Sequence, residues 1–234
     1  MPHDQDNESF GVYASPPCFL HELDPSYAGL TITPPALPAD EVGPWRKSER
    51  SRLISQRQAV GSQQRSKWDI DIAHALQGVL GDVRGAVISA YWPFRGEPDL
   101  RPLLGDVIAE GARVALPVVT EKKKPLTFRL WKPGDRLERG VWNIPYPAEG
   151  EIIRPNVVLA PVVGFDRAAY RLGYGGGFFD RTLAELGCSV RAIGIGYSQA
   201  ELPTIHPQPH DIPMSLIVTE SFIIKPSLGS LQSA

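Results

Sequence analysis

A glycine-rich loop between a predicted strand and a predicted helix is the feature that most constrains the fold of this chain. Four of the five residues at 173–177 are glycine, after an apolar run at 157–163 and before a helix-like segment at 180–186. Glycine lets such a loop adopt positive φ and lets an anion approach the main chain. A helix that follows adds free N–H groups and the positive end of its dipole. The pattern predicts a phosphate-binding site.

The loop does not identify its ligand by itself. Its glycine spacing matches neither a Walker A loop nor the dinucleotide-binding G-x-G-x-x-G pattern. Arg171 and Arg181 flank the loop and are suited to supply positive charge, and Asp180 is suited to hold a metal ion beside phosphates. A glycine-rich surface loop without a ligand is the alternative interpretation.

Helical and strand patterns alternate through the rest of the chain. Helices are predicted at 45–60, 65–80, 100–110 and 180–186, and strands at 85–91, 113–119, 126–131, 157–163, 190–197 and 214–219. This alternation predicts an α/β fold, a three-layer single domain with a largely parallel sheet. Ligands of such sheets bind beyond the carboxyl ends of the strands, and both the glycine loop and residues 92–97 follow such ends.

Charge separates an acidic N-terminal segment from a mildly basic body. Residues 1–44 hold seven acidic side chains and eight of the 23 prolines, without Lys or Arg, whereas residues 45–234 carry 24 basic and 19 acidic side chains. We expect an acidic, Pro-rich extension at 1–44, a catalytic domain at 45–225 and a short tail at 226–234. The weak, scattered positive charge of the body suits an anionic small molecule and disfavours nucleic acid.

Several classes of protein are disfavoured by the sequence. No apolar run approaches the ~18 residues of a membrane span, and no signal peptide is evident. Two cysteines, Cys18 and Cys188, make no disulfide framework. His206 and His210 lie four apart, but the prolines between them break any helix and no third ligand is near, which disfavours zinc. We expect a cytoplasmic monomer without membrane contact.

Several short motifs follow one another along residues 45–222. They are two cations four apart (Arg46 and Arg50), Ala-Leu-Pro at 115–117, Val-Trp-Asn-Ile-Pro at 141–145, Gly-Phe-Asp at 164–166, Arg-Leu-Gly-Tyr-Gly-Gly-Gly-Phe-Phe-Asp-Arg at 171–181 and Ile-Val-Thr-Glu at 217–220. In this order they resemble the 5-formyltetrahydrofolate cyclo-ligase family, also called methenyltetrahydrofolate synthetase. The resemblance implies a fold similar to the sugar-phosphate isomerase and coenzyme A transferase type. It also implies an ATP- and Mg²⁺-dependent ligase that converts 5-formyltetrahydrofolate to 5,10-methenyltetrahydrofolate and releases ADP and phosphate.

The resemblance also implies roles for particular residues. No covalent nucleophile is needed, because phosphoryl transfer depends on positioning and charge neutralisation, here chiefly by Arg50 and Arg171. Asp180 matches the magnesium ligand. The residues expected at the folate are Trp92, Glu97, Tyr174 and Phe178. Those expected at ATP are Arg46, Arg50, Arg171, Gly173, Tyr174, Gly175, Gly176, Gly177, Phe178 and Phe179.

Some of these residues have a plainer interpretation. Without the resemblance, Glu97 is a solvated loop acid and Trp92 a core aromatic. Asp180 also suits the N-cap of a helix that begins at Arg181. For Trp142 we favour core packing over a position in the wall of the folate pocket. Lys47 and Arg52 are equally well explained as an exposed basic helix face.

The chain departs from the family pattern at two positions. Arg46 stands where lysine is usual, which keeps the charge but changes the geometry. Ser215 stands where the family often has a second metal-site aspartate, and Asp211 is the candidate to replace it. These departures leave two alternative functions open: a nucleotide-binding paralogue with another substrate, and a non-catalytic binding or regulatory module.

Overall fold

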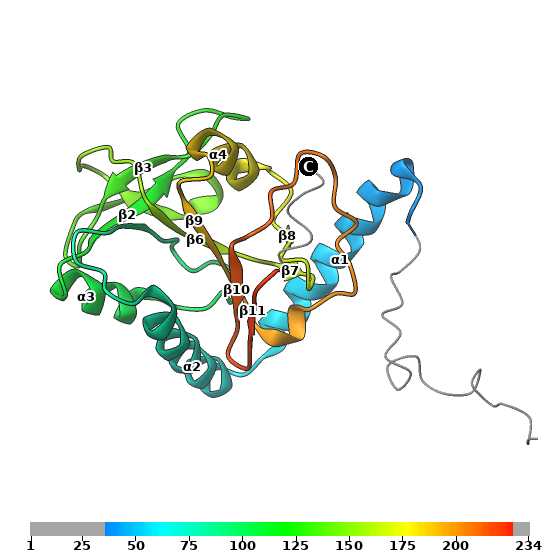
Figure 1. Ribbon diagram of the computed structural model, residues 1–234, viewed down its shortest axis with the longest axis horizontal. Coiled ribbons are helices and arrows are strands. Elements are labelled where there is room, and N and C mark those ends of the chain that lie inside the picture. The colour runs from blue at the N-terminus through cyan, green and yellow to red at the C-terminus, as the bar shows by residue number, and fades with distance from the viewer. Residues whose placement is uncertain (1–35, 227–234) are drawn as a thin grey trace, which may run out of the picture. The chain divides into compact units, whose positions relative to one another are not determined.

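The structure is a computed structural model. Its central element is a seven-stranded sheet with the order β11-β10-β9-β6-β1-β2-β3 (Figure 1). The structure describes residues 36–226, so the predictions for the N-terminal extension before residue 36 and for the tail lie outside the described residues. The strands of the sheet are β1 (Val87–Ser89), β2 (Arg113–Val118), β3 (Thr127–Leu130), β6 (Val157–Pro161), β9 (Arg191–Ile195), β10 (Leu216–Val218) and β11 (Ile223–Ile224). Every pairing from β2 to β10 is parallel, and β3 and β11 join the two edges antiparallel. The predicted largely parallel sheet is confirmed.

Helices cover both faces of the sheet. They are α1 (Ala39–Ala59), α2 (Ser62–Leu80), α3 (Arg101–Ala109) and α4 (Phe178–Leu186). Val158 and Ala160 of β6 belong to an apolar cluster with α1 and α4, whereas Leu159 between them belongs to a second cluster with α2 and α3. Side chains that alternate along a strand point to opposite faces, and here both faces are buried. The result is the predicted three-layer α/β arrangement.

Three helices begin before their predicted starts, among them α2, which begins at Ser62 rather than at residue 65. α1 begins at Ala39 rather than Trp45 and contains Pro44 within its second turn. Proline removes only one intrahelical hydrogen bond there, and the buried side chain of Val42 anchors the early part of the helix. α4 begins at Phe178 instead of Asp180, directly after the glycine loop.

α1 has an unusual buried face. Val42, Arg46, Leu53 and Arg57 recur at helical spacing and are all buried, so two of the four buried positions are arginines. Buried charge of this kind needs partners. The partners of both arginines lie in the segments that surround the candidate site.

Two small hairpins stand beside the sheet. β4 (Leu137–Arg139) pairs with β5 (Pro145–Pro147), and the 3-10 turn between them is η2 (Val141–Asn143). β7 (Gly164–Phe165) pairs with β8 (Arg171–Leu172) and delivers the chain from β6 into the glycine loop. A further 3-10 turn, η3 (Ser198–Ala200), follows β9.

Within residues 36–226, no helix combines the length and the apolar character that crossing a membrane requires.

Candidate active site

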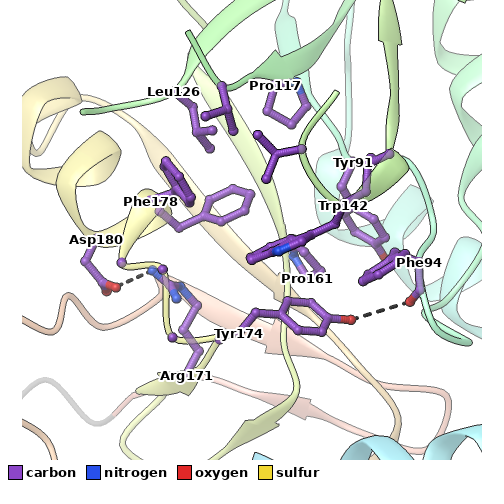
Figure 2. Close-up of a pocket in the computed structure, with 18 of the residues that line it drawn as sticks. Tyr91, Phe94, Pro117, Leu126, Trp142, Pro161, Arg171, Tyr174, Phe178 and Asp180 are labelled. Carbon is purple, nitrogen blue, oxygen red and sulfur yellow. Dashed lines mark hydrogen bonds and ion pairs between the residues drawn. The ribbon is translucent and has the colours of Figure 1, made fainter. Parts of the chain in front are cut away.

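A cavity of about 380 Å³ opens beyond the carboxyl ends of β1, β2 and β6 (Figure 2). This is the edge at which parallel α/β sheets bind ligands. Every residue predicted for ATP, folate or metal lines it, namely Arg46, Arg50, Trp92, Glu97, Arg171, Gly173, Tyr174, Gly175, Gly176, Gly177, Phe178, Phe179 and Asp180. The structure therefore brings together residues that the sequence spreads over more than half of the chain.

The glycine loop runs along one wall of this cavity. Gly175 and Gly177 have φ of 90° and 63°, a region that side chains other than glycine rarely adopt. Gly177 caps α4, and among residues 36–226 no side chain accepts a hydrogen bond from the first N–H groups of that helix. Gly176 does not have positive φ; a Cβ there would lie 2.9 Å from the ring of Phe178. The loop exposes main-chain N–H groups at a helix N-terminus, the arrangement that binds phosphate.

Two arginines, Arg50 and Arg171, lie next to the glycine loop and line the same end of the cavity. Arg50 of α1 donates from Nε to the carbonyl of Gly173, at 2.7 Å. Burial and the nearby Arg46 lower the pKa of Arg50, while Asp211 opposes the shift. Arg171 is buried, and its Nε has no hydrogen-bond partner among residues 36–226. The Arg171 guanidinium pairs with Asp180 through Nη2 at 2.8 Å and lies over the Phe179 ring, so it places positive charge beside the loop.

Arg46 makes its contacts within the protein. It is ion-paired with Asp211 and donates to the carbonyl oxygens of Ile205, at 3.0 Å, and His206, at 2.9 Å. These bonds fix the loop before β10 against α1. Burial opposes ionisation of Asp211, but the bonds from Arg46 and from the Gln208 N–H outweigh it and lower the pKa of Asp211.

Asp180 is not the N-cap of a helix, contrary to our alternative interpretation. It lies in the first turn of α4, where its Oδ1 accepts from Arg171 Nη2 at 2.8 Å and from the Ile212 N–H at 3.4 Å (Figure 2). Gly177 occupies the cap position because the helix begins earlier than expected. Oδ2 of Asp180 has no hydrogen bond to any of the described residues, and the side chain lines the cavity.

Ser215 lies away from the cavity. Its hydroxyl accepts from the Ala192 N–H at 3.1 Å, at the amino end of β10, and it does not line the site. Asp211 does line the site, but Arg46 already holds its carboxylate. Within residues 36–226 no three His, Cys, Asp or Glu side chains gather as a metal-binding group.

The opposite end of the cavity holds a buried carboxylate. Glu97 is 6% exposed, so the interpretation as a solvated loop acid is wrong. Its Oε2 accepts from the Phe94 N–H at 2.9 Å and its Oε1 from the Tyr174 hydroxyl at 2.8 Å. Burial raises the pKa of Glu97 to about 7, although Arg57 and both hydrogen bonds act in the opposite direction. A carboxylate with free lone pairs in such a pocket suits a ligand with several N–H donors.

Sequence reasoning missed Arg57, which organises this end. Arg57 Nη2 donates to the Tyr174 hydroxyl at 2.6 Å and lies 4.0 Å from Glu97 Oε1. Its Nε and Nη1 donate to the carbonyl oxygens of Arg95 and Val162. The sequence signal was its spacing, since Arg57 falls on the same helical face as Leu53 and Arg46 and not on the exposed basic face.

Aromatic rings line the space between the two ends. Trp142 is 51% exposed and lines the cavity, so the expectation of core packing is wrong. Its ring is nearly parallel to that of Phe94, with centroids 6.5 Å apart, and lies 5.9 Å from the Tyr174 ring (Figure 2). Trp142 and Asn143 both have positive φ, and such strain often marks a ligand site. Trp92 also lines the cavity and packs edge-on against Trp131.

The remaining candidates fall at the edge of the site. Arg181 donates to the Gly176 carbonyl at 2.7 Å, so it supports the loop from outside the cavity. Lys47 is exposed, and Arg52 is paired with Glu49 on the outer face of α1. His210 also lines the cavity, and its side chain is exposed. His206 packs its ring against Trp45.

Comparison with known proteins agrees with this geometry. The sequence profile of the 5-formyltetrahydrofolate cyclo-ligase family matches residues 42–220. The 5-formyltetrahydrofolate cyclo-ligase of Mycolicibacterium smegmatis is 33% identical over 76% of this chain and 95% of its own length. That of Escherichia coli is 27% identical over 72% of this chain and 97% of its own.

Solved structures give the same result. The 5,10-methenyltetrahydrofolate synthetase of Aquifex aeolicus aligns with a TM-score of 0.67 and 26% identity, over 77% of this chain and 92% of its own. The 5,10-methenyltetrahydrofolate synthetase of Mycoplasma pneumoniae aligns with a TM-score of 0.63, over 75% of this chain and 99% of its own. Its sequence identity is 23%, so it supports the fold alone. With the profile matching most of the chain, this protein belongs to the 5-formyltetrahydrofolate cyclo-ligase family.

Proposed function

We propose that the cavity catalyses the reaction for which the family is named, the ATP-dependent conversion of 5-formyltetrahydrofolate to 5,10-methenyltetrahydrofolate. The observation that carries the proposal is that one cavity is lined at one end by a glycine loop at a helix N-terminus, which suits an anion, and at the other end by the buried carboxyl group of Glu97, which suits a hydrogen-bond donor. A catalytic domain covering 45–225, together with the start of α1, acts as a monomer on these two small molecules.

The two ends of the cavity suit the two substrates. The ATP phosphates bind at the end formed by the glycine loop and the N-terminus of α4, where Arg50 and Arg171 neutralise their charge. Glu97 accepts hydrogen bonds from N–H groups of the pterin ring, and Trp92 supplies apolar contact. Tyr174 and Phe178 face both substrates. Arg46 lines the same space, but Asp211 neutralises its charge and two carbonyl groups take its other donors, so its contribution to the ATP site is mainly to hold the loop before β10 in place.

Placing the two substrates side by side explains the chemistry. The N5-formyl group is an amide, so its carbon is a weak electrophile and its oxygen a poor leaving group. Transfer of the γ-phosphoryl group from ATP to the formyl oxygen breaks the bond to ADP and gives an imidoyl phosphate. N10 then attacks the same carbon, inorganic phosphate departs with the oxygen, and the five-membered ring closes after N10 loses its proton. The second step is intramolecular and gains from proximity.

The protein contributes position and charge to these steps. Phosphoryl transfer needs in-line alignment and neutralised phosphate oxygens more than a covalent nucleophile. Arg50 and Arg171 supply that charge from rigid elements, because α1 and the β7–β8 hairpin hold them. The aromatic rings of Phe94, Trp142 and Tyr174 exclude water from the space where the imidoyl phosphate forms.

The residues present fit a magnesium ion beside the phosphates. Asp180 lines the cavity, and its Oδ2 has no hydrogen bond to any of the described residues. Mg²⁺ commonly takes one or two protein carboxylates and fills its other positions with water and phosphate oxygens, so a single aspartate is sufficient. When bound, the ion would supply charge neutralisation for the β- and γ-phosphates.

A spectroscopic assay tests the proposed function. The purified protein is mixed with 5-formyltetrahydrofolate, ATP and Mg²⁺, and the near-ultraviolet absorbance of the methenyl product is followed together with ADP release. We expect one methenyl product per ADP, and no product when ATP is omitted. Binding of ATP without any methenyl product would instead favour a paralogue with another substrate, and failure to bind either ligand would favour a non-catalytic module.

A further inference from the structure

Tyr174 joins the two ends of the cavity physically. Its backbone is the second residue of the glycine loop, between Gly173 and Gly175, whereas its hydroxyl reaches the buried Glu97 at 2.8 Å. A residue of the loop proposed for ATP is thus bonded to the carboxylate proposed for folate. Figure 2 shows its side chain crossing the floor of the cavity from the Arg171 side toward Phe94.

α1 holds this connection rigidly from behind. Arg50 bonds to the carbonyl of Gly173 at 2.7 Å, and Arg57, two helical turns later, bonds to the Tyr174 hydroxyl at 2.6 Å. The Tyr174 hydroxyl accepts from Arg57 and donates to Glu97. Both of these ionisable groups are buried, so the two hydrogen bonds lie in a region of low polarity. Such charge-assisted bonds are directional and stronger than those at a surface.

Beyond Tyr174, the loop is restrained by Arg181, which donates to the Gly176 carbonyl at 2.7 Å. Gly175 and Gly176 are exposed, and each carries no side chain that packs. Glycines are the residues that lose most conformational freedom when they become ordered, so a phosphate that binds them pays that entropy. A contact that already restrains Tyr174 lowers the entropy still to be lost by its neighbours.

We propose that Tyr174, held by Arg57, is a positioning residue that couples the two substrates, so that folate at Glu97 strengthens ATP binding at the glycine loop. This inference rests on the proposed function, because it takes Glu97 as the folate contact. A ligand that donates to Glu97 fixes the carboxylate, the carboxylate fixes the Tyr174 hydroxyl, and the hydroxyl fixes the start of the loop. By linkage, ATP strengthens folate binding by the same factor.

Calorimetry with a non-hydrolysable ATP analogue tests the coupling. The Kd of the analogue is measured with and without saturating 5-formyltetrahydrofolate, and the reverse titration is done for the folate. In the unmodified protein we expect each ligand to lower the Kd of the other by about tenfold, a typical coupling factor. In Tyr174→Phe, which keeps the ring and removes only the hydroxyl, we expect the factor to approach one even if the Kd of each ligand alone also rises.

Tyr197→Phe is the matched control. Tyr197 is also buried and its hydroxyl also donates to a carboxylate, Asp69 at 2.8 Å, but it does not line the cavity. The tenfold factor should persist in this variant. Thermal unfolding of both variants checks that each is folded at the titration temperature.

The outcomes separate the two proposals. Coupling that survives in Tyr174→Phe, or is absent from the unmodified protein although both ligands bind, overturns the coupling and leaves the proposed function intact. Coupling lost equally in Tyr197→Phe also overturns it, because the loss would then follow from removing any buried tyrosine hydroxyl and would not depend on the contact between Tyr174 and Glu97. An unmodified protein that binds neither ligand contradicts the proposed function itself.

Discussion

The two ends of the cavity are built in opposite ways. At the glycine loop the groups offered to a ligand are backbone N–H groups and arginines, supplied mostly by one continuous stretch of sequence at 171–180. At the Glu97 end they are side chains from three distant segments, Arg57, Glu97 and Tyr174, and the first two are buried. The proposed phosphate site is therefore built from neighbouring residues and lies open, whereas the proposed folate contact at Glu97 depends on tertiary assembly.

This difference predicts how each end fails. The glycine loop should be sensitive to backbone angles and to charge, and little affected by pH near neutrality. The Glu97 end should be sensitive to protonation, because burial raises the pKa of that carboxylate to about 7. Variants at each end therefore test this difference.

The largest effect is expected at Gly175, whose φ is 90°. Gly175→Val strains the backbone and places a Cβ 3.4 Å from the Arg50 guanidinium, so the loop can no longer present its N–H groups. We expect the Kd for a non-hydrolysable ATP analogue to rise by about 100-fold or more, equivalent to about 3 kcal/mol. Isothermal titration measures this loss.

Gly187→Val is the control for backbone strain. Gly187 has a φ of 75° at the C-cap of α4 and lies outside the cavity. Both valine variants should lose about 1–3 kcal/mol of the free energy of unfolding. Only Gly175→Val should lose ATP affinity, and equal affinities would remove the loop from the nucleotide site.

The next effect is expected for Asp180→Asn. An amide is a weaker ligand than a carboxylate for Mg²⁺, and it leaves the buried Arg171 without its ionic partner. Losing a residue that only supports a metal ligand typically costs about 10- to 100-fold in affinity or activity, so loss of a direct carboxylate ligand should raise the magnesium concentration for half-maximal rate by at least about tenfold. Magnesium titrations at fixed ATP measure it.

Asp211→Asn is the comparison for that experiment. Asp211 also lines the cavity, but its carboxylate is ion-paired with Arg46, so its loss should change the magnesium requirement much less. An equal rise in the magnesium requirement in both variants would place the ion between the two aspartates. A normal requirement in Asp180→Asn would remove Asp180 from the metal site.

The smallest effect on binding is expected for Glu97→Gln. The amide still accepts from the Tyr174 hydroxyl through its oxygen, so the glycine loop keeps its support. Poorly paired pterin donors cost about 1–3 kcal/mol when buried, and the KM for 5-formyltetrahydrofolate should rise by roughly tenfold, with the KM for ATP little changed. A larger change in the KM for ATP would assign Glu97 to the nucleotide.

The same variant tests the pKa of Glu97. The folded pKa, about 7, is above the ordinary value of 4.5, so the contribution of Glu97 to stability is complete below pH 4.5 and is lost as the pH rises to 7. Relative to Glu97→Gln, the unmodified protein should therefore lose roughly 3 kcal/mol across this interval. Urea unfolding at several pH values gives the difference, and a constant difference would mean that Glu97 keeps an ordinary pKa.

Local pattern was enough to predict the fold class and the glycine loop. The strand at 157–163 reads as buried on both faces, and the residues proposed to bind phosphate are consecutive in the sequence. The interpretation of Asp180 as an N-cap was wrong because the helix begins earlier, at the apolar residue Phe178, and Gly177 caps it.

Residues whose role depends on distant partners were not predictable in the same way. Arg57 reads as one of several cations on a basic helix, and only the folded structure brings it to Glu97 and Tyr174. Glu97 itself reads as a solvated acid because the residues that bury it lie elsewhere in the sequence. Trp142 reads as core because tryptophan is usually packed, but its left-handed backbone turns it toward the cavity.

The central claim is that ATP activates the formyl oxygen in this cavity, between the glycine loop and Glu97. Substrate labelled with ¹⁸O in the formyl group tests it directly, with mass spectrometry of the phosphate released in a single turnover. If the γ-phosphoryl group is transferred to that oxygen, each inorganic phosphate carries one ¹⁸O and ADP carries none. Unlabelled phosphate released together with the methenyl product would contradict the account.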